Sequence, residues 1–456
     1  MREIIEKERK IPVIQDVDIL VLGGGCTGVF AAVRAARLGA KVAIVEQTAA
    51  FGGVATNGFV AHWHALTDTT YERQIIAGLT TEVIDRLKRV PNGIIVNKAP
   101  DKIPGAEIQP RINTFFILNT EELKIELDDM LLSAGVTPYL HTLYTAPVVE
   151  DGRLTGVIIE NRSGRSAITA KYFIDATADG FLGADMGMET YHHDPLQPCT
   201  TAARVYGWDG LTALNDVLRE AEPELGYKIG WDTKIPGAPR ARAWFKSNMT
   251  VDCTSNENLT RCEIEGRRQT RRAMDYLRAH DPNGKDLSLL ALSSMVGIRE
   301  GRQLKCSYQV KGSDIYYGTV FPDAIAYCCY PVDIHRENKP TTYRFLDGVE
   351  KIVTVGQPGE YIRWRTDPGP YPLYWQLPYR CMLPENIGNL LICGRAIDAD
   401  KEALAAARVM VSLNQTGEAA GVAAFEALNS GKTVQEIDIP AMRRRMAAGG
   451  SILFDL

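Results

Sequence analysis

The chain has 456 residues, of which 45% are apolar and 23% charged, a composition typical of a soluble globular protein with more than one large core. A net charge of −5 provides no basic surface for nucleic acid, so we expect no nucleic-acid partner. The nine cysteines form no CxxC pair and no regular ladder, which argues against a disulfide framework, an iron–sulfur cluster or a structural zinc site, and we predict no metal.

Residues 1–10 are charged throughout and do not resemble a secretory signal. No apolar run approaches the roughly 20 residues of a membrane span. We therefore expect a cytoplasmic protein without membrane contact. Cys328 and Cys329 are adjacent, and could form a redox pair or be two buried thiols on a strand.

The clearest local pattern occupies residues 18–46. An apolar run at 19–22 ends in glycines, an alanine-rich segment follows, and a second apolar run covers 42–45. This order predicts strand, tight turn, helix and strand, the parallel unit that binds dinucleotides.

Each glycine of this unit has a physical role in that interpretation. Gly23 permits the sharp turn, Gly25 lets the backbone approach a pyrophosphate, and Gly28 lets helix and strand pack closely. Glu46 ends the second strand, where a carboxylate can accept both hydroxyls of a ribose and disfavours a 2′-phosphate. The predicted contacts with the cofactor also include Cys26, Thr27 and Gln47.

After this unit comes a loop of small residues, 47–58, in which Gly52 and Gly53 indicate backbone lying close to the cofactor. His62 and His64 follow almost at once. They share one face if this segment is a strand and do not if it is a helix.

Further along, the apolar spacing predicts helices over 80–90 and 120–134, and a short strand over 136–143. A β-meander then covers 146–150, 154–160 and 167–174, with a sharp hairpin at Asp151–Gly152. Its last strand runs into 175–180, which includes Ala178 and Asp179. This segment is either an ordinary acidic turn or the edge of a parallel sheet returning to the cofactor.

From about residue 186 the chain becomes richer in polar and aromatic residues. A helix is predicted over 263–280, with an arginine cluster that is either a solvated face or an anion site. Strands of a separate sheet are predicted over 316–330 and 371–379.

The first pattern returns near the C-terminus. A buried strand at 389–393 ends at Gly394–Arg395, a polar loop follows, and a long helix containing Gly417 and Gly421 runs to Leu428. We predict an α/β fold: a Rossmann-like dinucleotide-binding domain with a parallel sheet and a β-meander, interrupted by an inserted α+β domain. The expected boundaries are 1–185, 186–380 and 381–456.

Several segments together resemble the FAD-dependent oxidoreductases of the glutathione-reductase-type fold, and within them the branch related to fumarate reductase and succinate dehydrogenase flavoproteins. The signature GIREGRQL of that branch supplies Arg299 and Arg302. The other segments that carry the resemblance are GGGCTG, FGGVATNG, FIDATADG, PYRCMLPENIGNLLICGRAID and RVMVSLNQTGEAAGVAAFEAL.

This resemblance implies FAD as the cofactor. It also implies that the Rossmann-like domain is an FAD-binding domain and that the inserted α+β domain is a substrate domain. It places the pyrophosphate at the first glycines, the adenosine ribose at Glu46, and a helix beginning near Thr416 and Gly417 against the flavin pyrimidine, where a helix N-terminus stabilises negative charge. The adenosine half would contact Ala178 and Asp179, and the ribityl chain would lie near Gly394, Arg395 and Asp398.

Candidate catalytic residues follow from the chemistry that a flavin needs. His62 and His64 could take up the proton that accompanies a hydride, whereas Arg302 and Arg380 could bind a carboxylate. We regard His192, His193 and Arg365 as further candidates, and expect Arg299 and Glu300 to form a structural ion pair.

Three functions remain open at this point. The leading one is an FAD-dependent oxidoreductase that transfers a hydride between a small polar organic substrate and flavin, with an unknown electron acceptor and a possible homo-oligomer. The second is a flavoprotein subunit of a larger electron-transfer complex. The third is an NAD-binding module without redox chemistry.

Overall fold

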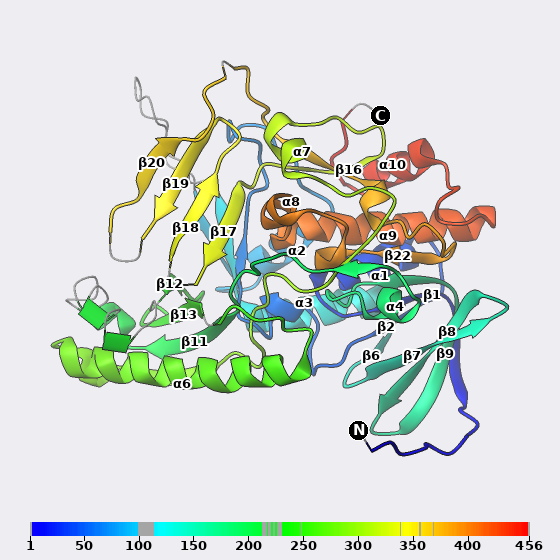
Figure 1. Ribbon diagram of the computed structural model, residues 1–456, viewed down its shortest axis with the longest axis horizontal. Helices are drawn as coiled ribbons and strands as arrows, with labels where there is room; N and C mark the ends of the chain where they lie inside the picture. The colour runs from blue at the N-terminus through cyan, green and yellow to red at the C-terminus, as the bar shows by residue number, and fades with distance from the viewer. Residues whose placement is uncertain are drawn as a thin grey trace.

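The computed structural model describes residues 2–98, 114–211, 217, 220–221, 224–225, 230–247, 249–337, 339–354, 357–367 and 369–454. Within these ranges the chain forms one large mixed sheet covered by helices, and several smaller antiparallel sheets beside it (Figure 1). No helix of this part of the chain combines the length and the apolar character needed to cross a membrane.

The large sheet has the strand order β6-β2-β1-β9-β8-β7, and β22 pairs with the carboxyl end of β9. Strands β6, β2, β1, β9 and β22 run parallel to one another, and β9, β8 and β7 form an antiparallel meander. The C-terminal strand therefore returns to the N-terminal sheet, as expected. The bounds are β1 Val13–Leu22, β2 Val42–Val45, β6 Thr137–Tyr139, β7 Leu143–Glu150, β8 Arg153–Asn161, β9 Gly164–Asp175 and β22 Leu390–Ile392.

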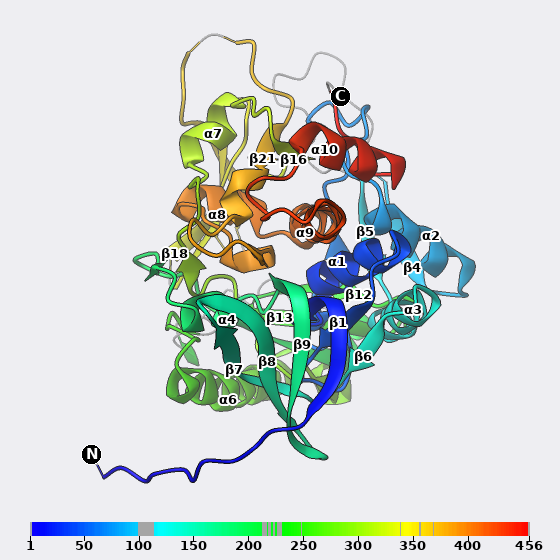
Figure 2. The ribbon, with the colours of Figure 1, turned by 90° about the vertical axis from the view of Figure 1, so that its right-hand side faces the viewer.

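Helices α1 (Cys26–Arg37) and α9 (Met410–Ser430) pack against each other beside this sheet (Figure 2). Their backbones touch because α9 carries glycines at the contact: a Cβ on Gly417 would lie 2.1 Å from the Thr27 carbonyl oxygen. The other helices near the sheet are α2 Leu79–Arg89, α3 Thr120–Ser133, α4 Phe181–Asp185, α8 Lys401–Ala407 and α10 Ile439–Ala448.

A four-stranded antiparallel sheet, β12-β13-β11-β14, packs on the long helix α6 (Asn256–His280) at the lower edge of the molecule in Figure 1. Trp244, Met274 and Leu277 are buried between them. The strands are β11 Thr200–Tyr206, β12 Trp231–Lys234, β13 Ala241–Ser247 and β14 Ser288–Leu292.

A second antiparallel sheet, β17-β18-β19-β20, lies at the upper left of Figure 1. Three smaller groupings connect these parts: β3-β5-β4, β10-β15 and β16-β21. Their bounds are β3 His62–Trp63, β4 Ile94–Asn97, β5 Phe115–Leu118, β10 Thr190–Tyr191, β15 Gln303–Leu304, β16 Ala324–Cys328, β17 Val332–Arg336, β18 Lys339–Arg344, β19 Val349–Val353, β20 Glu360–Arg363 and β21 Trp375–Pro378; the helix α7 spans Gly312–Tyr317.

Two predicted elements differ in the structure. The long C-terminal helix is interrupted: α8 ends at Arg408, and Val409 is extended (φ −65°, ψ 138°) before α9 begins. The strand predicted over 316–330 is wrong in its first half, because α7 ends there at Gly318, whose φ of +62° closes the helix. The domain boundaries at 185 and 380 stay a prediction.

Candidate functional site

The glycine loop after β1 leaves a cradle at the N-terminus of α1. Gly23 (φ +96°) and Gly28 are fixed by packing, because a Cβ on either would collide with the Ala176 or Gly23 carbonyl oxygen at 2.4 and 1.9 Å. Gly25 differs, since a Cβ there would meet no atom within 4 Å. The first-turn N–H groups of α1 begin at this opening, which suits an anionic group.

Glu46 and the second glycine pair close the side of this cradle. The Glu46 carboxylate accepts hydrogen bonds from Gly24 N at 2.6 Å and from Thr48 N at 2.8 Å. Gly52 N donates to the Gly24 carbonyl oxygen at 2.8 Å, and a Cβ on Gly53 would lie 3.1 Å from the Gly25 Cα. The two glycine segments therefore lie against each other, as the sequence suggests.

The thiol of Cys26 belongs to the same contact. Its Sγ lies 3.6 Å from the Gly52 carbonyl oxygen, and burial raises the pKa of Cys26 to about 12. We conclude that Cys26 holds the two glycine segments together and is not a nucleophile. Gln47 is exposed, and its contact with a cofactor stays a prediction.

Arg395 and Asp179 form a buried pair where β9 and β22 end. The Arg395 Nη2 lies 2.8 Å from the Asp179 Oδ1, beside Ala178, whose φ is +70°. Gly301 packs directly on this pair, since a Cβ there would lie 2.2 Å from the same carboxylate oxygen. The predicted residues Ala178, Asp179, Gly394 and Arg395 thus come together at the carboxyl ends of neighbouring parallel strands.

Three predicted cofactor contacts, Asp398, Thr416 and Gly417, have partners within the protein, and their contact with the cofactor stays a prediction. Both carboxylate oxygens of Asp398 are engaged, by Tyr191 Oη at 2.7 Å and by Cys306 N at 2.8 Å. Thr416 and Gly417 are not at a helix start, because α9 begins six residues earlier, at Met410. Thr416 accepts a hydrogen bond from Gly394 N, and Gly417 packs on α1, so these residues position elements of the fold.

Two buried polar groups in this region have no partner within the described part of the chain. The Nη1 of Arg395 is one, and both amide atoms of Asn414, which is fully buried, are the other. Asn414 precedes Gly417 by three residues and Gly421 by seven, so it lies on the face of α9 that meets α1. An unpaired buried amide is costly, which indicates that a polar ligand satisfies it.

A second group of polar side chains surrounds Asp333 on β17. Its carboxylate accepts hydrogen bonds from Tyr330 Oη at 3.1 Å and Arg408 Nη2 at 3.0 Å, and lies 3.1 Å from His335 Nε2. Arg408 is the residue at the break between α8 and α9. We call Tyr330, Asp333, His335, Arg408 and Arg299 the Asp333 cluster.

Arg299 supplies a second guanidinium to the Asp333 cluster. Its Nη1 donates to the Pro198 carbonyl oxygen and to Thr200 Oγ1, each at 2.5 Å. Burial, and then the like charge of Arg408, lower the pKa of Arg299 to about 10, so Arg299 remains charged at neutral pH.

The carboxyl group and the imidazole of the cluster also have shifted pKa values. Burial would raise the pKa of Asp333, but His335, Arg408 and Arg299 outweigh it and hold that pKa well below its usual value. Burial lowers the pKa of His335 to about 4, leaving the ring neutral at neutral pH. With two guanidinium groups and one carboxylate, the Asp333 cluster carries a net positive charge inside the protein.

The expected ion pair between Arg299 and Glu300 is wrong. Glu300 accepts hydrogen bonds from the backbone and side-chain amides of Gln197 instead. Gln197 Oε1 in turn accepts from His335 N at 2.9 Å and Arg408 Nη2 at 3.4 Å. Consecutive residues point apart here, and sequence adjacency misled the prediction.

The two histidines after the glycine loop, His62 on β3 and His64 just beyond it, lie on one side of the chain, since both rings contact Phe115. His64 reaches the cluster, with its ring 5.1 Å from that of Tyr330. His62 faces Thr233 Oγ1 at 3.0 Å instead. Burial lowers the pKa of each histidine to about 4.

The predicted arginines lie elsewhere. Arg380 pairs with Asp323 through Nε at 3.0 Å and Nη2 at 3.1 Å, and Arg365 is bound to Asp367. Arg302 lies over the ring of Phe181, with 5.8 Å between the guanidinium carbon and the ring centre. The structure therefore does not bring Arg302 or Arg380 into the Asp333 cluster.

Two further histidine candidates have structural partners. His192 Nε2 lies 3.5 Å from an Asp252 carboxylate oxygen, and His193 Nε2 lies 3.0 Å from the Ala399 carbonyl oxygen.

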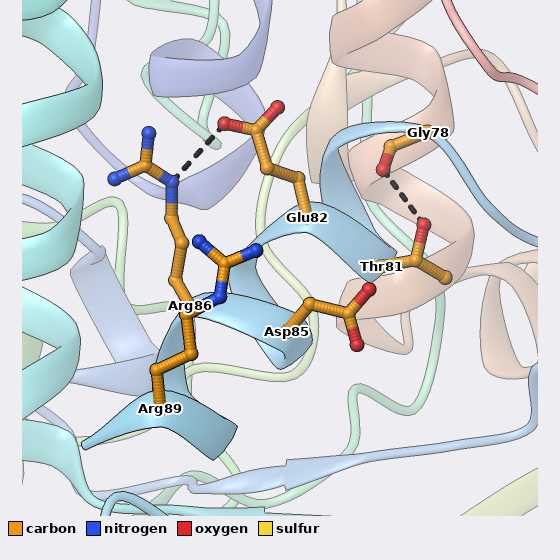
Figure 3. A pocket seen from close by; sticks show the side chains of 6 residues that line it. All are labelled: Gly78, Thr81, Glu82, Asp85, Arg86 and Arg89. Atoms are coloured by element: carbon orange, nitrogen blue, oxygen red, sulfur yellow. Dashed lines mark hydrogen bonds and ion pairs between the residues drawn. The ribbon is translucent and has the colours of Figure 1, made fainter.

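A surface hollow on helix α2 is a separate feature. It is lined by Gly78, Thr81, Glu82, Asp85, Arg86 and Arg89, and an ion pair of 3.1 Å between Arg86 and Glu82 crosses it (Figure 3). None of the residues predicted to bind a cofactor or substrate lines this hollow.

Comparison with known proteins assigns the chain to a family. The sequence profile of the family described as FAD dependent oxidoreductase matches residues 18–446. The chain belongs to this family. FAD is therefore its cofactor, and the enzyme is an oxidoreductase; the hypothesis of an NAD-binding module without redox chemistry is wrong.

Individual relatives are distant. A thiamine thiazole synthase of Methanococcus vannielii is 24% identical over 170 residues, which are 36% of this chain and 56% of the relative, so the chain spans about half the length of this curated relative. The p-nitrophenol 4-monooxygenase of Pseudomonas putida has a TM-score of 0.48 at 10% identity, covering 96% of this chain and 89% of that one. A geranylgeranyl bacteriochlorophyll reductase-like protein of Thermoplasma acidophilum has a TM-score of 0.45 at 12% identity, covering 95% and 83%.

The residues present fit FAD. An opening at Gly25 before the N-terminus of α1 suits its pyrophosphate, and Glu46 lies at the side of that opening. The unpaired atoms of Asn414 and Arg395 give a polar ligand hydrogen-bonding partners. Sequence reasoning missed Asp333, His335 and Tyr330, because they follow no motif. It also did not single out Arg408, although this residue begins the segment RVMVSLNQTGEAAGVAAFEAL; the other available signal was Arg299 in GIREGRQL.

Proposed function

We propose that this FAD-dependent oxidoreductase transfers a hydride between flavin and a small organic substrate that carries a carboxylate. The observation that supports it is the net positive charge of the Asp333 cluster, where Arg408 pairs with the Asp333 carboxylate and the charge of Arg299 also lowers the pKa of that carboxyl group. A buried excess cation is costly unless an anion accompanies it, and a substrate carboxylate supplies that anion.

Arg408 and Arg299 bind the carboxylate in this proposal. Arg408 is held through Nη2 by Asp333, while its buried Nε has no partner within the described residues. Arg299 is held through Nη1 by Pro198 and Thr200. Each guanidinium has five N–H donors in a planar fork, so each retains donors for a carboxylate after these anchoring bonds are made.

His64 exchanges the proton. Bound flavin supplies the hydride acceptor or donor. The ring of His64 is neutral at neutral pH and can accept a proton from a substrate C–H, O–H or N–H group beside Tyr330. Because an anionic substrate favours the imidazolium form, carboxylate binding raises the basicity of His64 at the moment when it is needed.

Several finer expectations belong to this proposal. The glutathione-reductase-type fold and the branch related to fumarate reductase remain our placement of the chain, supported by GIREGRQL and by an arginine pair suited to carboxylates. We also place the enzyme in the cytoplasm, with an unidentified electron acceptor and a possible homo-oligomer. A flavoprotein subunit of a larger electron-transfer complex is the alternative.

The test is a titration of the flavin-loaded enzyme with a panel of small mono- and dicarboxylates, followed through the visible flavin band. Each acid is paired with its neutral amide. We expect saturable spectral changes with at least one acid and none with its amide, and loss of the response in Arg408→Gln. Arg271→Gln on the exposed face of α6 removes the same charge and should leave the response unchanged. A response that survives Arg408→Gln and Arg299→Gln, or one that amides produce equally, would overturn the proposal.

A further inference from the structure

Three cysteines far apart in the sequence come together beside the Asp333 cluster. Cys199 immediately precedes β11, Cys253 lies in the turn before α6, and Cys262 is in the second turn of α6. Their Sγ atoms all lie within 4.8 Å of one another, and those of Cys199 and Cys262 are 3.2 Å apart. Each side chain is nearly or fully inaccessible to solvent, with 3%, 5% and 0% of its residue exposed.

The surroundings of these thiols are apolar. Val296 is buried against them, and Met249, Val251, Leu259 and Ile298 pack on the same group. The one backbone acceptor close to a thiol is the Met249 carbonyl oxygen, 3.4 Å from Cys199 Sγ, among the contacts of the described residues. Three buried sulfurs that face one another in an apolar pocket form a soft ligand set.

We propose that Cys199, Cys253 and Cys262 bind a thiophilic metal ion, Zn²⁺ or Cu⁺, through three thiolates. A zinc–sulfur bond of about 2.3 Å places ligand sulfurs about 3.8 Å apart in a tetrahedron and about 4.0 Å apart in a triangle. The Cys199–Cys262 separation of 3.2 Å is shorter than these values, and no pair of the three sulfurs is more than 4.8 Å apart, so the ligands need to shift by about 1 Å or less to meet a metal.

Binding of a metal cation ionises its cysteine ligands, because a thiol that coordinates a metal is deprotonated. The proposed site would therefore hold the metal through three thiolates, and metal binding would release protons.

The site has a structural consequence for the proposed substrate arginine. Pro198 and Thr200 flank Cys199, and both accept a hydrogen bond from Arg299 Nη1. A metal that fixes Cys199 to α6 therefore also fixes both acceptors of Arg299. The metal site itself does not depend on the carboxylate chemistry proposed above.

The first measurement is the metal content of the flavin-loaded enzyme, purified without chelators in medium containing zinc and copper salts. We expect about one Zn²⁺ or Cu⁺ per chain, and about tenfold less in Cys253→Ser and Cys262→Ser. Cys328→Ser, a buried thiol on β16 outside the group, is the matched control and should keep the metal. Elemental analysis distinguishes the two metals, and either supports the proposal.

Two measurements on the unsubstituted enzyme keep the test independent of variants that fold poorly. X-ray absorption at the metal edge should show a sulfur shell at about 2.3 Å. Cobalt(II) added after chelation should give thiolate-ligated absorption at wavelengths longer than the oxidised flavin band. Failure to retain any metal, a shell of oxygen and nitrogen only, or a Cys199–Cys262 disulfide in anaerobically purified enzyme would overturn the metal site.

Discussion

Two buried groups in this protein each contain an arginine–carboxylate ion pair, but they differ in their balance of charge. Arg34 on α1 pairs with Glu418 on α9, and that carboxylate also accepts hydrogen bonds from Leu79 N at 3.0 Å and Gln415 Nε2 at 3.0 Å. The Asp333 cluster contains two arginines for one carboxylate. One group is balanced in charge, and the other is not.

The pKa values record this difference. Burial raises the pKa of Glu418, although Arg34 opposes it. Asp333 is equally removed from water, yet the surrounding cations and His335 bring its pKa below the usual value. The charges of the Arg34–Glu418 pair match, whereas Asp333 faces two guanidinium groups, and our proposal places a substrate carboxylate beside the second group and not the first.

Breaking the balanced pair should have the largest effect on stability. Glu418→Ala leaves Arg34 buried without its partner, and we expect the free energy of unfolding to fall by about 3 to 5 kcal/mol. Urea unfolding of the flavin-loaded enzyme measures this loss. Glu82→Ala is the matched control, because Glu82 also pairs with arginines but is about a third exposed, and it should cost about 1 kcal/mol or less. Equal losses in the two variants would contradict our interpretation of the Arg34–Glu418 pair.

Breaking the unbalanced group should affect the reaction rather than the fold. Arg408→Gln leaves Arg299 to neutralise Asp333, so we expect little change in the free energy of unfolding. We expect kcat/KM for a carboxylate substrate to fall about 100-fold, which corresponds to a loss of about 2.7 kcal/mol of transition-state stabilisation. Steady-state kinetics and urea unfolding on the same preparation separate the two effects. A large loss of stability with unchanged kcat/KM would show that Arg408 is a structural residue like Arg34.

The same contrast explains what could be predicted from the sequence. The cradle at Gly25 and the position of Glu46 follow from local spacing, because strand, turn and helix are consecutive and each glycine answers a local steric demand. The β-meander was confirmed for a similar reason, since Asp151 and Gly152 both take the positive φ of a tight hairpin turn.

The Asp333 cluster could not be found in this way. Arg299, Asp333 and Arg408 come from three distant segments, and only the pairing of β17 with its sheet and the break before α9 bring them together. That break interrupts an alanine-rich stretch with high intrinsic helix propensity, so tertiary contacts of Arg408 override the local preference. Arg302 and Arg380 were proposed because a guanidinium can bind a carboxylate, and nothing local in the sequence distinguishes Arg408 from them, although Arg408 also lies in a segment that resembles the family.

Acid should weaken the fold through the histidines near the unbalanced group. The pKa values of His64 and His335 are about 4 in the folded protein and about 6.5 when unfolded, so their contribution is complete above about pH 6.5 and is lost as the pH falls toward 4. We expect each histidine to contribute about 1 to 3 kcal/mol to the free energy of unfolding, measured by urea unfolding across this pH range.

The pKa of Glu418 is raised in the folded protein, so this residue contributes stability with the opposite pH dependence: its contribution grows as the pH falls.

His335→Gln removes one of the two imidazoles beside Asp333. Because that imidazole disfavours the folded state at acid pH, the variant should show a flatter dependence of the free energy of unfolding on pH between about pH 6.5 and pH 4. An unchanged slope in that variant would mean that His335 titrates normally in the folded protein.

The smallest effect should come from the arginine that the sequence favoured. Arg380 is 43% exposed and held by both oxygens of Asp323, and it lies over the ring of Tyr308, so its charge is already balanced at the surface. We expect Arg380→Gln to change kcat/KM by less than about twofold and the free energy of unfolding by less than about 1 kcal/mol. If Arg380→Gln instead reduced kcat/KM as strongly as Arg408→Gln, charge balance would fail as a guide to function here, and the carboxylate site would have to include the Arg380–Asp323 pair.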